Sequence, residues 1–265
     1  MRPRSMFRRG LSASVALLLL TGVTACSGDS DGDPQPAPSA SQAPSAEVAS
    51  RARSELAARA AQAMDTAYAA LYTLDDGRGR PRNVVATVGR DGTWRVDVTG
   101  GALGGAADVS IVSTANGVYQ CTLGSQSNPI NPTCVKVAKA GKRVPADYSP
   151  KVERLFRQWL PVFTDRQAAL SVAEVPPLAG AEGTCYSIDS ISASLADPVD
   201  IGIYCYADDG VLAAARVGFG ELKVTNQIAG PATVTLPGPE TAGPPMGMDA
   251  PPPPPVQPTG VVPSA

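Results

Sequence analysis

Histidine is absent from the 265 residues of this chain, and aromatic residues make up only 5% of it. Without an imidazole, the chain cannot build a Ser-His-Asp triad, a Cys-His pair or a histidine metal site. The charge is nearly balanced, with 22 Lys and Arg against 24 Asp and Glu and a net charge of −2. Because nucleic-acid-binding proteins carry a basic patch, no nucleic-acid partner is expected.

Motifs that would carry chemistry or hold a cofactor are also missing. No G-x-S-x-G, Walker or G-x-G-x-x-G motif follows a strand and opens a helix, and no lysine stands in a Ser-x-x-Lys box. Asp75-Asp76 and Asp208-Asp209 are carboxylate pairs that a hydrolase could use, but a glycine follows each pair, which favours turns. Gly100-Gly101 and Gly104-Gly105 open no helix and favour a flexible loop over a phosphate cradle. We therefore expect no enzyme, no catalytic residue, no metal site and no cofactor.

The first 25 residues have the features of an export signal. Four arginines stand within the first nine residues, and the apolar run from Leu11 to Leu20 follows them. This run, even extended to Ala25, is shorter than the roughly 20 residues that a transmembrane helix needs. Residues 1–25 are therefore expected to be a signal peptide and not a permanent membrane span.

The signal ends in Val23-Thr24-Ala25-Cys26, which resembles the lipobox of bacterial lipoproteins. The resemblance implies cleavage before Cys26 and a diacylglycerol on its thiol, so that acyl chains anchor the protein to the extracytoplasmic face of the cell membrane. The alternative is an ordinary signal peptide cut near Ala25, which would leave Cys26 as a free thiol. Arginine far outnumbers lysine, and alanine, glycine, valine and proline are abundant, which suggests a high-GC genome and an actinobacterial-type lipoprotein.

Two segments of biased composition flank a single domain, which is expected at residues 45–236. Residues 26–44 are rich in serine, proline, aspartate and glycine and lack large apolar side chains, so they are expected to form a flexible tether. Residues 237–265 are proline-rich and include the run Pro251–Pro255, which favours an extended polyproline II segment. This tail is interpreted as a disordered spacer, with binding to a proline-recognising partner as the alternative.

Two helices are expected in the domain. A helical stripe of small and apolar residues begins after Ser45, its N-cap, and continues to Asp75-Asp76-Gly77, which predicts a long N-terminal helix. A middle helix is expected to begin at Ser149 and Pro150, and Pro161 would end or kink it.

Elsewhere the apolar period changes to two, which is typical of half-buried strands. The expected strands are 84–88 with 93–98, 108–115 with 118–123, 200–207 with 211–217, and 170–175, 185–191, 221–225 and 233–236. Asn116-Gly117 predicts a type I′ turn, which needs positive φ at both central residues. Alternation and short turns indicate an antiparallel sheet with helices on one side, an α+β fold.

The odd number of cysteines leaves one without a partner if the other four pair. Cys26 is assigned to the lipid, and three pairings of Cys121, Cys134, Cys185 and Cys205 remain open in principle. We favour Cys121–Cys134 and Cys185–Cys205, because each closes a short loop between strand ends. A Cys₄ zinc site is the alternative, but its Cys-x₂₋₄-Cys spacing is absent, and so is the Cys-x-x-Cys of a redox site.

The order of the elements resembles the LolA-like lipoprotein-carrier fold, which includes mycobacterial lipid-binding lipoproteins of the LppX/LprG type. The resemblance covers roughly residues 46–236 and rests on a long helix, hairpins carrying GTWRVDV and IVSTANGVYQ, a middle helix and a last meander. Asn116 to Tyr119 is the most similar segment. The resemblance implies a curved antiparallel sheet, a half-barrel wrapped on helices, with an apolar cavity for acyl chains. The two disulfides are not part of that general pattern.

Apolar side chains could line such a cavity between sheet and helices. The candidate ligand-binding residues are Trp94, Val96, Val98, Ile111, Phe156, Trp159, Leu160 and Phe163, with Leu170 and Val172 beside them. The alternative is that they fill a core. The sequence thus predicts a membrane-anchored lipoprotein that binds or carries a lipid or other apolar ligand. The alternative is a non-catalytic interaction or structural lipoprotein of the cell envelope, with a filled core and an envelope protein as its partner.

Overall fold

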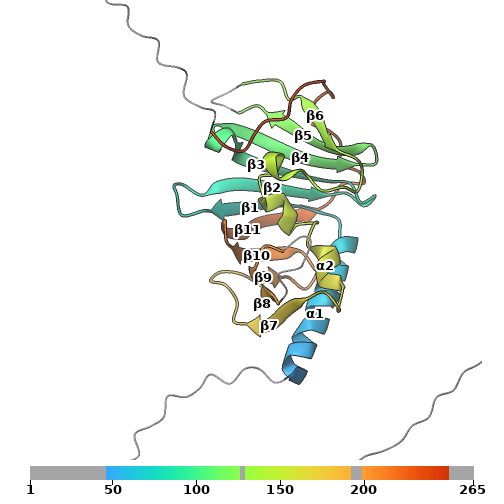
Figure 1. Ribbon diagram of the computed structural model, residues 1–265, viewed down its shortest axis with the longest axis vertical. Helices are drawn as coiled ribbons and strands as arrows, with labels where there is room; N and C mark the ends of the chain where they lie inside the picture. Colours follow the sequence, from blue (N-terminus) through green and yellow to red (C-terminus); the bar gives the residue numbers. More distant parts are fainter. Residues whose placement is uncertain (1–45, 126–128, 192–198, 251–265) are drawn as a thin grey trace, which may run out of the picture. The chain divides into compact units, whose positions relative to one another are not determined.

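The computed structural model describes residues 46–125, 129–191 and 199–250 of the chain. Over these ranges the backbone forms a sheet of eleven antiparallel strands and two α-helices (Figure 1). The predicted signal peptide, Cys26, the tether, Ser45 and the run Pro251–Pro255 lie outside the described residues.

The sheet consists of two meanders that join where the first and last strands pair. The strands are β1 (Tyr68–Asp75), β2 (Arg82–Val88), β3 (Trp94–Ala102), β4 (Ala107–Thr114), β5 (Gly117–Leu123), β6 (Cys134–Ala138), β7 (Leu170–Val175), β8 (Thr184–Ser190), β9 (Gly202–Tyr206), β10 (Leu212–Val217) and β11 (Gly220–Ala229). They are arranged in the order β6-β5-β4-β3-β2-β1-β11-β10-β9-β8-β7. The pairing of β1 with β11 therefore holds the two halves of the chain in one sheet.

The N-terminal helix α1 (Ala46–Asp65) is shorter than the sequence predicts. It contacts the second helix, α2 (Leu160–Thr164), and β7 (Figure 1). Residues Tyr68–Asp75, which were expected to continue α1, form β1, and their exposure alternates along the strand. Pairing with β2 and β11 satisfies the backbone groups of this segment, and its alternate side chains are buried, so tertiary packing overrides the helical stripe. No described helix is long and apolar enough to cross a bilayer.

The middle helix is also different from the prediction. The segment that follows Ser149 forms a 3₁₀ turn at Val152–Leu155, and Lys151 before it has a φ of 66°, which interrupts a regular helix. Pro161 lies in the first turn of α2 instead of ending the preceding helix. This position suits proline, because the first turn of a helix has no partner for its N–H groups.

The predicted hairpins are confirmed as pairs β2–β3, β4–β5 and β9–β10, but two local predictions are wrong. Thr114 pairs with Gly117, so the turn residues are Ala115 and Asn116, and neither has a positive φ. The turn is therefore not of type I′. The predicted strand at residues 233–236 is not a strand, although Val234 is buried and its N–H bonds to the side chain of Thr93.

The start of the C-terminal segment is packed on the domain, contrary to the expected tail from residue 237. The Cys134 N–H donates to the Pro239 carbonyl at 2.9 Å, and the Thr241 N–H donates to the Cys134 carbonyl at 2.8 Å. The buried Gln120 amide bonds both backbone groups of Met246, at 2.6 and 2.9 Å. These bonds pair the outer edge of β6 at Cys134 and satisfy the buried amide of Gln120, so the packed region extends beyond the predicted boundary.

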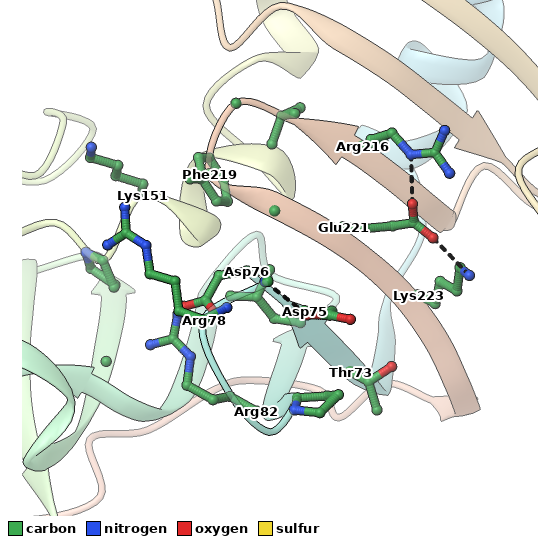
Figure 2. A pocket seen from close by; sticks show the side chains of 18 of the residues that line it. Thr73, Asp75, Asp76, Arg78, Arg82, Lys151, Arg216, Phe219, Glu221 and Lys223 are labelled. Atoms are coloured by element: carbon green, nitrogen blue, oxygen red, sulfur yellow. Dashed lines mark hydrogen bonds and ion pairs between the residues drawn. The ribbon is translucent and has the colours of Figure 1, made fainter.

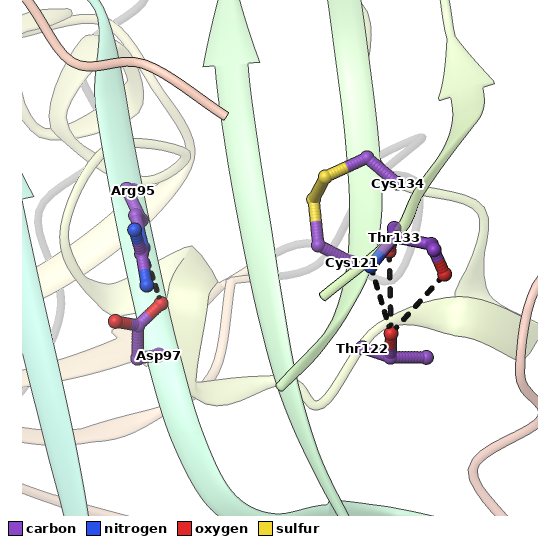
Figure 3. The surroundings of a disulfide bond; sticks show 6 residues. All are labelled: Arg95, Asp97, Cys121, Thr122, Thr133 and Cys134. Atoms are coloured by element: carbon purple, nitrogen blue, oxygen red, sulfur yellow. Dashed lines mark hydrogen bonds and ion pairs between the residues drawn. A yellow bond between two sulfur atoms is a disulfide. The ribbon is translucent and has the colours of Figure 1, made fainter. Parts of the chain in front are cut away.

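Both predicted disulfides are present. Cys121 and Cys134 lie opposite each other on β5 and β6, with Cα atoms 4.0 Å apart (Figure 3). Cys185 and Cys205 lie opposite each other on β8 and β9, with Cα atoms 3.9 Å apart. The first bridge therefore joins the edge strand β6 to β5, and the second joins β9 to β8, which lies beside the other edge strand, β7. Two disulfides are consistent with an oxidising compartment.

Replacing Cys121 and Cys134 together by alanine is expected to lower the free energy of unfolding by about 3 kcal/mol, because the open chain gains conformational entropy when unfolded. Urea unfolding followed by circular dichroism measures this loss. The matched variant removes Cys185 and Cys205, and a similar loss is expected for its slightly longer loop. Unchanged urea midpoints in both variants would contradict a stabilising role for the bridges.

Candidate functional site

The apolar side chains predicted to line a cavity lie in the packed interior. One continuous core cluster contains Val96, Val98, Phe156, Trp159, Leu160, Phe163, Leu170 and Val172. Ile111 is fully buried. The rings pack closely: Phe163 meets Tyr204 edge to face with centroids 5.2 Å apart, and Phe156 lies 5.0 Å from Tyr72. The structure therefore packs most of these side chains against one another in the core, and only Trp94 of the set, which is partly buried, lines one of the hollows described below.

A hollow of about 920 Å³ opens at one end of the sheet and is called the sheet-end pocket here (Figure 2). Its lining comes from the ends of β1, β3 and β10, the starts of β2 and β11, the two connecting loops, residues 149–151 and Met248. Leu74 and Val217 form its apolar base and belong to the core cluster, on which Phe219 and Met248 also pack. The pocket therefore joins the end of the core to solvent.

Most charges around the sheet-end pocket neutralise one another. Glu221 accepts hydrogen bonds from Arg216 at 2.6 Å and Lys223 at 2.7 Å, and these bonds, that of Lys223 first, lower its pKa (Figure 2). Arg82 donates to Asp76 at 3.0 Å and to the Gly100 carbonyl at 2.8 Å. The Arg82–Asp76 pair is neutral, whereas the group of Arg216, Lys223 and Glu221 keeps one positive charge.

Two cations of the pocket have no such partner. Among the described residues, no carboxylate lies within ion-pair distance of the Arg78 or Lys151 side chain, and both residues are exposed. Lys151 is held at its positive φ by the hydroxyl of Ser149, which accepts its N–H at 3.1 Å. Such backbone strain in a non-glycine residue persists only where surrounding contacts fix it. Figure 2 draws Arg78, Lys151 and Phe219 on one side of the pocket and Glu221 with its partners on the other.

The two aspartate pairs form turns, as the alternative to catalysis predicts. Asp75 and Asp76 accept the N–H groups of Gly77 and Arg78 at 2.9 and 3.0 Å. Asp209 accepts the Val211 N–H at 3.0 Å. In the described part of the chain no group of three or more Cys, Asp or Glu side chains is arranged to hold a metal ion.

The glycine-rich loop differs from its prediction. Gly100 and Gly101 lie within β3, and Gly104 and Gly105 belong to a 3₁₀ turn that follows it. The Gly104 N–H donates to the carbonyl of Met248 at 2.8 Å. A Cβ at Gly104 would approach Ala250 to 2.7 Å, so this glycine lets the C-terminal segment pack closely.

A second hollow of about 270 Å³ is lined by Trp94 and by Glu153, a buried carboxylate. Glu153 accepts a hydrogen bond from the Ser149 hydroxyl at 2.5 Å through Oε1, whereas Oε2 has no partner among the described residues. Burial raises the pKa of Glu153 to about 7. The same Ser149 hydroxyl therefore links this carboxylate to the backbone of Lys151 in the sheet-end pocket.

Sequence reasoning missed the residues that make the sheet-end pocket distinctive. Arg78, Arg80 and Arg82 alternate along the loop after β1, and this pattern could have been noticed. Lys151, Phe219 and Met248 carry no local signal, because only the topology brings their segments to the same end of the sheet.

An open antiparallel sheet with helices on one side is the class of fold that these observations define. No family model and no curated protein sequence matches the chain. Among solved structures, the one titled "Crystal structure of MucB" is similar with a TM-score of 0.41 and 12% sequence identity. The match covers 74% of this chain and 65% of the MucB chain, so it spans less than two thirds of that protein.

Proposed function

We propose that this protein is an extracytoplasmic lipoprotein anchored through a diacylglycerol on Cys26, and that its domain binds an amphipathic ligand at the sheet-end pocket. The lipobox-like Val23-Thr24-Ala25-Cys26 supports the anchor. The two disulfides support an oxidising location outside the cytoplasm. Binding without catalysis fits a chain that has no histidine and uses its aspartate pairs in turns.

This proposal rests on one observation: the sheet-end pocket reaches the hydrophobic core. Leu74 is 2% and Val217 8% exposed, and both belong to the core cluster while lining the pocket. A ligand with an apolar part could cover Phe219 and Met248, which are only partly buried, and keep its polar part among the charges of the rim. An amphiphile satisfies both surfaces at once.

A LolA-like half-barrel would go further and hold the acyl chain of the ligand inside the domain, between the sheet and the helices. In the present structure rings such as Phe163 and Tyr204 occupy that space, so a chain would have to enter past Phe219 and Met248 and displace core side chains. The packed interior favours a second candidate function. In this alternative the protein is an interaction lipoprotein with a filled core, and its C-terminal tail reaches a partner protein of the cell envelope.

Native mass spectrometry of the chain exported through an oxidising compartment tests ligand binding. We expect an added mass that organic extraction removes, or saturable uptake of an added amphiphile when the protein is isolated empty. Phe219→Asp should abolish uptake, and Ile228→Asp, at a 64% exposed position of β11 outside the pocket, should not. A protein that takes up no amphiphile would leave the filled-core interaction lipoprotein as the function.

Replacing Cys26 by serine is expected to move the protein from the membrane fraction to the soluble fraction, because the acyl chains would be its only anchor. Cell fractionation and immunoblotting measure this, and the Ser27→Ala variant serves as the control that stays bound. If the Cys26→Ser protein remains on the membrane, the lipid anchor is refuted.

A further inference from the structure

We infer that the sheet-end pocket recognises a phosphate or phosphate-ester group through Arg78 and Lys151. This inference rests on the proposed function, because it names the polar part of the amphiphile that the pocket would bind. The same chemistry is found in a phospholipid headgroup and in a free phosphate compound, which the experiment below separates.

The charge of the lining is the first argument. Five basic side chains face three acidic ones: Arg78, Arg82, Lys151, Arg216 and Lys223 against Asp75, Asp76 and Glu221. This positive excess occurs in a chain whose net charge is −2. Arg82 is paired with Asp76, and Arg216 and Lys223 share Glu221, so Arg78 and Lys151 are the two lining cations without an ion-pair partner among the described residues. Asp75, which accepts the Gly77 N–H, is the one lining carboxylate without a cation partner among the described residues, so the lining keeps a positive excess. A concave site with such an excess focuses the field and attracts an anionic ligand.

The origin of the two cations is the second argument. Arg78 stands on the loop between β1 and β2, whereas Lys151 stands before the 3₁₀ turn at Val152–Leu155, so an anion between them would be held from two separate segments. A guanidinium offers a planar fork of donors and an ammonium a compact charge, a combination suited to the several oxygens of a phosphate. A carboxylate offers one charge and two oxygens, and would satisfy these cations less completely.

The loop itself provides the third argument. A smaller hollow of about 440 Å³ adjoins the sheet-end pocket and shares Arg78 and Arg82 with it, and Arg80 lines it as well. Arg78 and Arg82 therefore line both hollows, whereas Arg80 lines only the smaller one. Arg82 is immobilised by Asp76 and Gly100, which leaves Arg78 as the arginine free to turn toward an anion.

Three probes distinguish the polar and apolar contributions to ligand binding: dodecyl phosphate, dodecyl maltoside and inorganic phosphate. The two dodecyl compounds are used below their critical micelle concentrations. Binding to the exported full chain carrying Cys26→Ser is measured by isothermal titration calorimetry. We expect dodecyl phosphate to bind most tightly, and Arg78→Ala with Lys151→Ala to weaken its binding at least about tenfold, because both charge-assisted hydrogen bonds to the phosphate are lost. The control, Arg90→Ala with Lys139→Ala, removes the same charges from exposed positions outside the pocket.

Each other outcome has a separate meaning. Equal binding of dodecyl phosphate and dodecyl maltoside, unaffected by the pocket variant, would overturn the inference and leave the proposed function intact. Equal binding of inorganic phosphate and dodecyl phosphate, lost in the variant, would support the anion site and refute an amphipathic ligand. Failure of all three probes would overturn both. Binding of dodecyl phosphate should also weaken in 0.5 M salt, whereas that of dodecyl maltoside should not.

Discussion

Replacing Phe163 by alanine is expected to lower the free energy of unfolding by about 3–5 kcal/mol. The side chain is fully buried in α2, and its ring packs edge to face on Tyr204 at 5.2 Å. Its removal therefore loses both the transfer free energy of the ring and its contacts with the surrounding core. Urea unfolding, with the midpoint and slope fitted together, measures the loss.

This prediction separates a filled core from a ligand cavity. If the space between sheet and helices were a binding cavity, Phe163→Ala would change stability little and ligand uptake strongly. Phe163→Leu keeps most of the apolar volume and is expected to lose only about 1–2 kcal/mol, so it remains measurable if the alanine variant does not fold. Ile228→Ala, at a 64% exposed position, is the matched control and should stay within about 0.5 kcal/mol of the parent.

The strands were the most predictable part of this fold, because their period of two is local. The expected strand 170–175 coincides with β7, and the cysteine spacing was enough to select both disulfides. The end of α1 was not predictable. Tyr68 and Tyr72 are four residues apart, so they satisfy a helical stripe and an alternating strand equally well, and only pairing with β2 and β11 decides between the two.

The candidate site was harder to predict from the sequence than the strands were. Apart from Ile111, the apolar side chains predicted to line a cavity lie in or against one core cluster, but the sequence could not show whether they enclose a space or fill it. Filling depends on the shapes of rings such as Phe163 and Tyr204 once they meet. The pocket residues Arg78 and Lys151 meet only because the sheet returns both segments to one end, a relation that no sequence spacing expresses.

The buried Glu153 makes stability depend on pH in a direction opposite to that of most carboxylates. It is 2% exposed, and desolvation is the largest cause that raises its pKa, to about 7, with a smaller contribution from Asp200. The Ser149 hydrogen bond and the charge of Arg154 act in the other direction and do not compensate for burial. The basic side chains that line the adjoining hollow are Lys142, Arg143 and Arg157. The folded protein therefore binds this proton more tightly than the unfolded chain does.

Replacing Glu153 by glutamine is expected to stabilise the protein by up to about 3 kcal/mol at pH 8 and to have little effect at pH 4. Below the unfolded pKa of about 4.3 both states hold the proton and the parent has its full stability. As the pH rises toward 7 the unfolded chain loses its proton first, so the parent loses stability, and above the folded pKa the loss is complete. Glutamine stays neutral and keeps an acceptor for the Ser149 hydroxyl.

Urea midpoints of the parent and of Glu153→Gln, measured from pH 4 to pH 8.5, test this dependence. The exposed Glu182→Gln variant is the matched control and should follow the parent curve. Parallel curves for the parent and Glu153→Gln would show that Glu153 does not titrate in this window. Because Ser149 joins this carboxylate to the backbone of Lys151, diverging curves should be accompanied at pH 8 by weaker binding of dodecyl phosphate to the parent, with its charged Glu153, than to Glu153→Gln. Comparing the two proteins at the same pH removes the effect of the second ionisation of the ligand, which falls in the same range.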